Sequence, residues 1–261
     1  MTAINLNQIR KSILEVSARA REGHIPSAFS ILEILNVLYS DVMDINGIRS
    51  CSPDRDRFIL SKGHGSLALY FILRELDLIT AQDINAFCSY AGLLGGHPHR
   101  SPIHGIEAST GSLGHGFPIA VGLAMSLRDR QSPARVYCLV GDGECNEGAI
   151  WEASLLAAHH RLSNLMCIVD FNHSGDRAVE LGSLTQKFGA FGFEVLEVDG
   201  HDSLMLRGAL AHRDANRPLA VVANTVKGFG LRPMENNPAW HHAFPTDNQI
   251  NDFIQLLSED A

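Results

Sequence analysis

Two short polar runs each follow an apolar segment and contain residue types that could bind a divalent cation. Gly141-Asp142-Gly143 comes after the apolar segment 136–140, and Asp170-Phe171-Asn172 closes the segment 165–170. Carboxylate and amide oxygens are ligands that Mg²⁺ and Ca²⁺ prefer. A diphosphate approaching the backbone between the two glycines would be repelled by Asp142 unless a cation lay between them. We therefore expect Asp142 and Asn172, with a backbone carbonyl near Ser174, to bind such a cation together with a diphosphate.

Other interpretations of these runs use the same residues. A simple turn at 141–143 with a helix cap at Asn172 accounts for them equally well. A dinucleotide site fits less well, because the run Gly141-x-Gly143-x-x-Asn146 lacks the third glycine of that fingerprint. An EF-hand loop fails, since Glu147 would occupy the position that requires glycine. Spacing alone leaves the cation site and the simple turn open.

The segments around these runs predict a mostly parallel sheet with helices on both faces. Solidly apolar strands that alternate with helical segments are typical of such sheets. Ligands of parallel sheets bind beyond the carboxyl ends of the strands, where both polar runs lie. The expected strands are 57–60, 136–140, 165–170, 194–198 and 219–224, and the expected helices include 8–22, 30–39 (capped by Ser30), 66–76, 117–128 and 147–161. The fold class is therefore α/β, with one domain over residues 1–261.

Composition argues against several classes of function. The 261 residues include 21 Lys plus Arg and 29 Asp plus Glu, a formal charge of −8, and 45% are hydrophobic. This balance is typical of a globular chain, and its acidity argues against nucleic-acid binding, which needs a basic face. We expect neither an export signal nor a membrane span. The five cysteines have no C-x-x-C spacing, which indicates reduced thiols in a cytoplasmic protein.

The hydrophobic residues of segment 92–116 recur with neither the helical nor the strand period. The segment is rich in glycine and holds four of the 13 histidines. A long irregular stretch inside a compact domain is more often functional than not. His97, His99 and His104 would suit zinc by residue type, but no cysteine or carboxylate ligand is suitably spaced beside them.

Five motifs follow the same order as in transketolases and together span nearly the whole chain. The first run with its asparagine, Gly141-Asp142-Gly143-Glu144 to Asn172, resembles the thiamine-diphosphate motif of that family. The others are Ser61-Lys62-Gly63-His64, Gly96-His97-Pro98, Glu107-Ala108-Ser109-Thr110-Gly111-Ser112-Leu113-Gly114, and Val226-Lys227-Gly228-x-Gly230 with Met234-Glu235-Asn236-Asn237 to Trp240-His241. The chain resembles the N-terminal, thiamine-diphosphate-binding (PP) subunit of a split, two-chain transketolase.

The resemblance implies an enzyme that transfers a two-carbon ketol unit from a ketose or ketose phosphate to an aldose. Thiamine diphosphate would carry the carbon chemistry, with Mg²⁺ or Ca²⁺ bound by Asp142, Asn172 and the carbonyl of Ser174. The implied cofactor contacts are His64, Gly111, Ser112, Leu113, Gly141, Asp142, Gly143, Glu144 and Asn172. The implied catalytic residues are His24, His97 and His241 on the substrate side, and Glu147 toward a glutamate of a partner chain. No role is implied for His99, His104, His115, His160, His173, His212 or His242.

The resemblance also implies that the active site is shared with another chain. In this family the glutamate that activates the cofactor lies in a second domain. We therefore expect a separate C-terminal, pyrimidine-binding subunit, an α₂β₂ assembly, and a large apolar face that closes against other subunits.

One run departs from the family pattern. After Asn172 the chain continues His173-Ser174-Gly175-Asp176-Arg177-Ala178, without the apolar residue expected against the cofactor ring. This departure predicts a substrate outside central pentose-phosphate metabolism, in a specialised sugar pathway.

Three other functions remain open at this stage. Another thiamine-diphosphate enzyme, either like 1-deoxyxylulose-phosphate synthase or a 2-oxo-acid decarboxylase, would share the cofactor motif, although His24, His97 and His241 favour ketose substrates. A non-catalytic regulatory subunit would keep the fold. A nicotinamide-dependent dehydrogenase would bind NAD without a metal.

Overall fold

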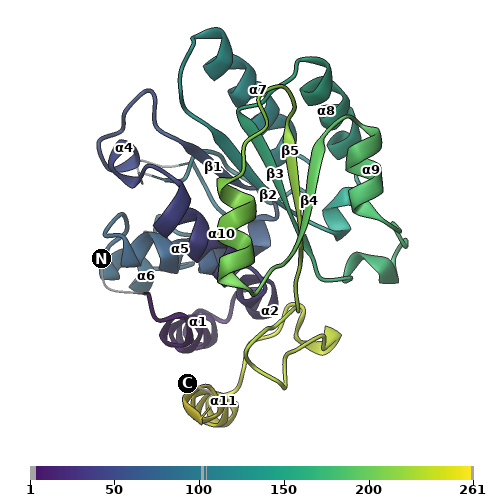
Figure 1. Ribbon diagram of the computed structural model, residues 1–261. Coiled ribbons are helices and arrows are strands. Elements are labelled where there is room, and N and C mark those ends of the chain that lie inside the picture. Colours follow the sequence, from purple (N-terminus) through teal and green to yellow (C-terminus); the bar gives the residue numbers. More distant parts are fainter. Residues whose placement is uncertain (1–3, 101–102, 104, 260–261) are drawn as a thin grey trace.

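The computed structural model describes residues 4–100, 103 and 105–259. Its centre is a five-stranded parallel sheet with the strand order β1-β2-β3-β5-β4 (Figure 1). The strands are β1 (Arg57–Leu60), β2 (Val136–Gly141), β3 (Leu165–Phe171), β4 (Glu194–Asp199) and β5 (Leu219–Asn224). The predicted α/β class is confirmed, and every predicted strand is right to within one residue at each end.

Alternate side chains of the strands enter two hydrophobic cores, one on each face of the sheet. In β2, Val136 and Cys138 pack into one core, and Tyr137 and Leu139 pack into the other. The first core is covered by α7 (Gly116–Asp129), α8 (Gly148–His159) and α9 (Leu184–Ala190), and the second by α2 (Ile25–Phe29), α3 (Leu32–Val37), α5 (Ser66–Glu75) and α10 (Ser203–Ala211). Because helices cover both faces, polar groups that act on a ligand are confined to the strand ends.

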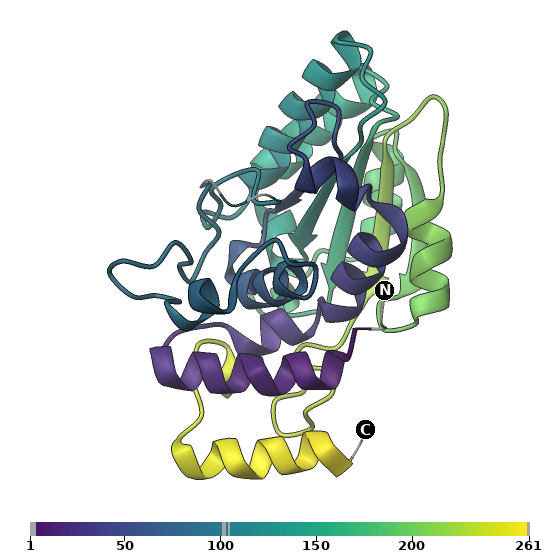
Figure 2. The ribbon, with the colours of Figure 1, turned by 90° about the vertical axis from the view of Figure 1, so that its left-hand side faces the viewer.

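Two further helices, whose buried side chains extend the second core, hold the segment that follows β5. Helices α1 (Leu6–Ala20) and α11 (Asp247–Glu259) lie side by side (Figure 2). Lys11 Nζ donates to Ser258 Oγ at 2.8 Å, and the ring of Phe253 on α11 packs against Trp240. The remaining elements are α4 (Ile45–Arg49), α6 (Ala81–Asn85), a π-helical turn η1 (Leu38–Val42), and 3₁₀ turns η2 (Gly63–Gly65), η3 (Gly143–Asn146), η4 (Gly175–Arg177) and η5 (Pro238–Trp240). Residues 225–246 are thereby anchored at both ends.

The helix expected from Ser30 to residue 39 is wrong at its start. Helix α2 ends at Phe29, α3 begins at Leu32, and the chain then continues into η1. Ser30 is the C-cap of α2, and its hydroxyl donates to Asp170 Oδ2 at 2.9 Å instead of capping a helix N-terminus. The Ser30 hydroxyl bonds the buried carboxylate of Asp170, which is 140 residues away in the sequence. No local sequence pattern reveals such a partner.

The described part of the chain contains no helix with both the length and the apolar character needed to cross a membrane. All five cysteines are free thiols. Cys138, Cys145 and Cys167 are buried, whereas Cys51 and Cys88 are exposed.

Candidate metal and diphosphate site

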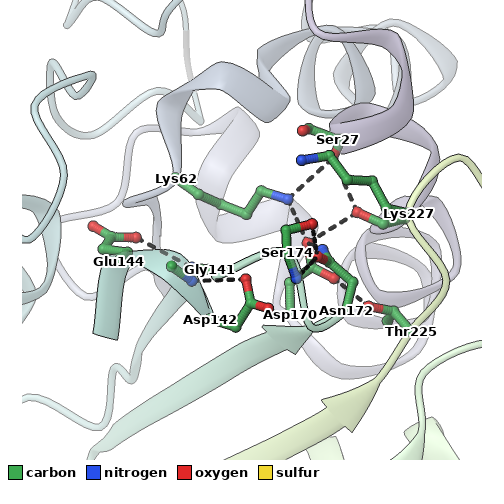
Figure 3. Close-up of polar contacts among 12 residues, drawn as sticks. Ser27, Lys62, Gly141, Asp142, Glu144, Asp170, Asn172, Ser174, Thr225 and Lys227 are labelled. Atoms are coloured by element: carbon green, nitrogen blue, oxygen red, sulfur yellow. Dashed lines mark hydrogen bonds and ion pairs between the residues drawn. The ribbon is translucent and has the colours of Figure 1, made fainter. Parts of the chain in front are cut away.

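A buried ion pair lies at the carboxyl edge of the sheet. Lys62, just after β1, pairs with Asp170 at the end of β3 (Figure 3). Asp170 also accepts hydrogen bonds from Ser30, Asn172 and Thr225. Burial by itself raises the pKa of Asp170, but the Lys62 charge and these hydrogen bonds outweigh it and hold the pKa below its usual range. Asp170 is therefore an ionised anchor that ties together the ends of β1, β3 and β5.

Asp142 lies in the turn between β2 and η3, close to this anchor. Its Oδ1 accepts from the Gly143 N–H at 2.7 Å, and its Oδ2 accepts from the Gly175 N–H at 3.3 Å. Among the described residues it has no ion-pair partner, and both burial and the charge of Asp170 raise its pKa. A bound cation would offset both effects. The carboxylate is therefore suited to a metal.

The turn after β3 presents an amide oxygen beside Asp142. Asn172 Nδ2 donates to Asp170 at 3.0 Å, which orients the amide so that Oδ1 is its acceptor atom. The same Oδ1 accepts from the Ser174 N–H at 3.1 Å and from the Ser174 hydroxyl, which a bound cation would displace. Ser174 is followed by the run that departs from the family pattern. A Cβ on Gly175 would lie 2.7 Å from Gly143 Cα, so a glycine there lets η4 pack against the Asp142 turn.

Glu144 connects three segments from inside the molecule. Its carboxylate accepts hydrogen bonds from the hydroxyl of Ser61 and from the N–H groups of Gly114 (2.8 Å) and Gly141 (3.2 Å). Burial raises its pKa. Because donors of this chain already reach both oxygens, Glu144 holds the strand-end turns in place, and its expected contact with a cofactor stays a prediction.

The glycine-rich segment is anchored by Glu107 and Thr110. Arg55 donates to the two oxygens of Glu107 at 2.8 and 2.9 Å, and the Thr110 hydroxyl donates to the Leu60 carbonyl at 2.7 Å. These contacts place the following glycine, Gly111, beside the end of β1. A Cβ on Gly111 would lie 3.3 Å from the ring of His97, so this glycine allows the imidazole to approach.

Five histidine rings from four separate segments gather beside the two turns: His24, His64, His97, His241 and His242. The centroid of the His24 ring lies between 4.5 and 6.0 Å from the other four. Burial is the main reason that the pKa of His24 is lowered to about 4, and burial also lowers the pKa values of His64, His97 and His241. These four imidazoles are therefore neutral at pH 7, which suits them to exchange protons with hydroxyl groups.

Lys227 connects the oxygen groups with the histidines. Its Nζ lies 2.9 Å from His241 Nδ1, and since an ammonium has no acceptor, Nδ1 is the acceptor. Burial and the charge of Lys62 lower the pKa of Lys227 to about 8.

A buried network positions the segment that carries Lys227. His201 Nε2 accepts from the Val226 N–H at 2.8 Å, so the proton of this imidazole is on Nδ1, which donates to Glu33 at 3.2 Å. The ring of His201 stacks on Phe229 with 3.6 Å between centroids. Glu33 is also paired with Arg10 from α1. The segment after β5 therefore depends on contacts from α1 and α3.

One cavity brings together most of the residues that the sequence predicted. Its lining includes the predicted residues His64, Leu113, Gly141, Asp142, Gly143, Glu144, Asn172, Ser174 and His241. An adjoining cavity of about 420 Å³ shares Asn172, Ser174 and His241 with it. His24 and His97 join through the ring cluster, and Gly111 and Ser112 belong to the adjacent loop.

Two predictions stand apart from this cavity. Glu147 is exposed at the N-cap of α8, and its carboxylate forms no hydrogen bond with the residues that the structure describes. It lies beside Gly114, where a Cβ would come within 2.6 Å of Glu147 Cβ. His104 lies outside the described residues, so the structure leaves the set of His97, His99 and His104 undescribed as a group.

Several residues of the site received no role from the sequence, among them Ser27, Lys62, Asp170, Lys227 and His242. Ser27, Lys62 and Lys227 line the cavity, and His242 lies in the ring cluster. Lys62 and Lys227 lie within motifs that directly follow apolar strands, and this position is a signal that could have identified them. Ser27 and His242 carry no such signal, because their surroundings come from distant segments.

Comparison with known proteins places the chain in a family. The profile of the "Transketolase, thiamine diphosphate binding domain" matches residues 2–258. The chain belongs to the transketolase family. The domain that it matches is the one named for thiamine diphosphate binding, which supports the expected cofactor.

Individual transketolase subunits match along nearly their whole length. The chain is 34% identical to one subunit of the apulose-4-phosphate transketolase of Phocaeicola vulgatus over 257 residues, which cover 96% of this chain and 91% of that one. It is 35% identical to the 6-deoxy-6-sulfo-D-fructose transketolase subunit SqwG of Clostridium sp., covering 98% and 95%. The predicted resemblance to one subunit of a split transketolase is therefore confirmed.

Solved transketolases confirm the fold. The structure superposes on transketolase from Campylobacter jejuni with a TM-score of 0.84 at 28% identity, over 97% of this chain and 42% of that one. For transketolase from Leishmania mexicana the TM-score is 0.80 at 26% identity, over 98% and 45%. The chain thus spans less than half the length of these two transketolases.

Proposed function

We propose that this chain is the thiamine-diphosphate-binding subunit of a two-component transketolase, which transfers a two-carbon ketol unit from a ketose to an aldose. The observation that carries the proposal is one cavity lined both by the oxygen groups of Asp142 and Asn172 and by the imidazoles of His64 and His241. The oxygen groups suit a cation with a diphosphate, and the imidazoles suit a polyhydroxylated substrate.

The residues of this cavity fit thiamine diphosphate and a hard cation. Asp142 lacks an ion-pair partner within the described chain, and the buried hydroxyl of Ser27 has no hydrogen-bond partner there. Asp142, Asn172 and the Ser174 carbonyl would hold Mg²⁺ or Ca²⁺, and Lys227 would balance the charge of a diphosphate. When bound, the cofactor supplies the nucleophilic carbon for exchange of carbon–carbon bonds. The further proposed contacts are His64, Gly111, Ser112, Leu113, Gly141, Gly143 and Glu144.

His24, His97 and His241 would bind the hydroxyl groups of the sugar and move their protons. A neutral imidazole has one donor and one acceptor nitrogen. Because His241 Nδ1 accepts from Lys227, its proton is on Nε2 and can be donated to an oxygen that becomes negatively charged. The low pKa of His24 keeps that ring neutral, so one of its nitrogens can accept a hydrogen bond from a hydroxyl group.

The enzyme would need a separate pyrimidine-binding subunit, and we propose an α₂β₂ assembly. The relatives that match along nearly their whole length are named as subunits, which supports a second chain. Glu147 is exposed and free to meet a glutamate of that chain. The five free cysteines support a cytoplasmic location.

The substrate would be a ketose of a specialised sugar pathway that carries an anionic group. The relatives named above act on apulose 4-phosphate and on a sulfonated fructose. Arg177, in the run that departs from the family pattern, is exposed beside the larger cavity, and among the described residues its guanidinium has no acidic partner. A cation in this position favours a phosphorylated or sulfonated sugar.

The test is reconstitution of the enzyme from two purified chains. This chain is mixed with a candidate pyrimidine-binding subunit, thiamine diphosphate and Mg²⁺, and ketol transfer from a phosphorylated or sulfonated ketose to an aldose is followed. We expect transfer with both subunits and none with either alone. Full transfer by this chain alone, or release of carbon dioxide from pyruvate in place of ketol transfer, would contradict the proposal.

A further inference from the structure

We propose that Glu22, His24 and His242 form a second metal site, which binds a transition-metal ion of the zinc class at the edge of the histidine cluster. The site is separate from Asp142 and Asn172. Each of its three side chains offers one ligand atom, and these atoms all lie within 4.8 Å of one another.

The three residues come from segments that the fold brings together. Glu22 lies in the turn after α1, His24 precedes α2, and His242 follows η5. His242 Nε2 is 3.1 Å from Glu22 Oε1, and the rings of His24 and His242 are 4.5 Å apart at their centroids. Zinc ligands lie about 2.0–2.2 Å from the metal. Small side-chain rotations, chiefly of the exposed His242, would therefore bring all three atoms to a shared ion.

His24 has one ring nitrogen without a hydrogen-bond partner in the described part of the chain. Its Nδ1 is buried and has no hydrogen-bond partner among the described residues. A buried polar atom without a partner is unfavourable, and a metal bond would remove this deficit.

The ligand types select the metal. Two imidazoles and one carboxylate with an open fourth position are typical of zinc sites that accept a water or substrate oxygen. Mg²⁺ prefers oxygen ligands in octahedral geometry, so it would remain at Asp142 and Asn172. The two sites therefore differ in the kind of ion that each one binds.

Occupation of this site would block the proposed substrate side. His24 is among the groups proposed to bind the sugar, and a metal ion held by this ring would occupy space beside the groups that contact the sugar. We therefore infer that zinc inhibits the enzyme reversibly, a consequence that rests on the proposed function, whereas metal binding itself does not.

Calorimetry with Zn²⁺ on the purified full chain tests binding directly, with saturating Mg²⁺ present. We expect one Zn²⁺ per chain. His242→Ala should weaken its affinity at least about tenfold, since even loss of a group that only supports a ligand costs 10–100-fold. Glu22→Gln should weaken it as well, because the amide keeps a hydrogen bond to His242 but lacks the charge. His159→Ala, which removes an exposed imidazole on α8, is the matched control and should have no effect. Unchanged Zn²⁺ affinity in His242→Ala, or an equal loss in His159→Ala, would overturn the site.

The reconstituted two-chain enzyme tests the consequence. Zn²⁺ should inhibit ketol transfer, a chelator should restore it, and His242→Ala should require at least about ten times more Zn²⁺ for the same inhibition. Absence of ketol transfer before zinc is added would contradict the proposed function but not the site measured by calorimetry. Full activity with the site saturated by Zn²⁺ would refute inhibition.

Discussion

Asp142 and Asp170 are neighbouring buried carboxyl groups whose surroundings move their pKa values in opposite directions. Asp170 is buried, but Lys62 and several hydrogen bonds keep its pKa low. For Asp142, burial and the Asp170 charge raise the pKa, and two backbone N–H groups offset this in part. Two carboxyl groups with opposed shifts have different roles. Asp170 is satisfied by the protein itself, whereas Asp142 gains most from a cation supplied from outside.

Replacing Asp142 by alanine should abolish metal-dependent cofactor binding while leaving the fold intact. Loss of a charged metal ligand should lower the affinity of the two-subunit enzyme for thiamine diphosphate, at saturating Mg²⁺, at least about 100-fold. Losing a residue that only supports a metal ligand already costs about 10–100-fold in metal affinity or activity. Calorimetry measures the affinity, and circular dichroism measures the fold. Asp129→Ala, at an exposed aspartate on α7, is the control. Unchanged affinity in Asp142→Ala would remove Asp142 from the metal site.

Cofactor binding should weaken as the pH rises through about 8. Lys227 has a pKa of about 8 in the free protein, and a bound diphosphate would raise that pKa because it stabilises the ammonium. Below pH 8 the charge is present before binding, whereas above pH 8 binding must take up a proton, so affinity should fall by up to about tenfold per pH unit. Affinities at pH 7, 8 and 9 check this. The Lys227→Met variant should bind the cofactor weakly, with an affinity that does not change between pH 7 and 9. If its affinity still falls with pH, the pH dependence belongs to another group.

The strands position the site through one buried ion pair. Asp170 at the end of β3 receives hydrogen bonds or charge from Lys62 after β1, Thr225 after β5 and Ser30 after α2. Elements that are distant along the chain therefore meet at a single carboxylate. The turns that carry Asp142 and Asn172 rest on this junction, through backbone and amide contacts to Asp170.

Asp170→Asn should destabilise the chain, because it leaves Lys62 as a buried charge without its partner. The expected loss is about 3–5 kcal/mol in the free energy of unfolding, measured by urea denaturation at pH 7. The double variant Lys62→Met with Asp170→Asn should recover part of that loss, since it removes the unpaired charge. The folded-state pKa of Asp170 is depressed, so its stabilisation is full above the unfolded value of about 3.9 and is lost as the pH falls below it. A double variant no more stable than Asp170→Asn would contradict the pairing.

At the scale of the whole molecule, one face remains apolar and exposed. Helices α7 and α8 form a groove lined by Val121, Met125, Ala153 and Leu156, and Leu155 is 59% exposed nearby. An exposed apolar groove of this kind marks an interface. Glu147 precedes α8 at the same end as Ala149 of the groove, so the pyrimidine-binding subunit expected at Glu147 would also cover it.

Leu156→Glu should prevent assembly with the pyrimidine-binding subunit without unfolding this chain. A charge in the centre of an apolar interface is strongly unfavourable, and the expected loss of affinity is at least about 100-fold. Analytical ultracentrifugation of the mixed subunits measures assembly, and thermal unfolding of this chain alone measures stability. Leu204→Glu is the matched control, because Leu204 is 76% exposed on α10. Equal assembly of both variants would place the interface elsewhere.

The amino-acid sequence alone was enough to predict the parallel sheet and the polar turns at the ends of two of its strands. The strands are apolar throughout because both faces are covered, so they stand out as short hydrophobic runs, and Asp142 and Asn172 stand out because polar residues follow two of those runs directly. These signals are local.

The tertiary structure alone decided which side chains share a cavity. Lys62 meets Asp170 across 108 positions of the chain, and Glu22 meets His242 across 220. Ser30, which looked like a helix cap, is bound instead by Asp170. Such partners are chosen by strand order and helix packing. Their hydrogen bonds and charges act over a few ångströms in space, whatever the separation along the chain.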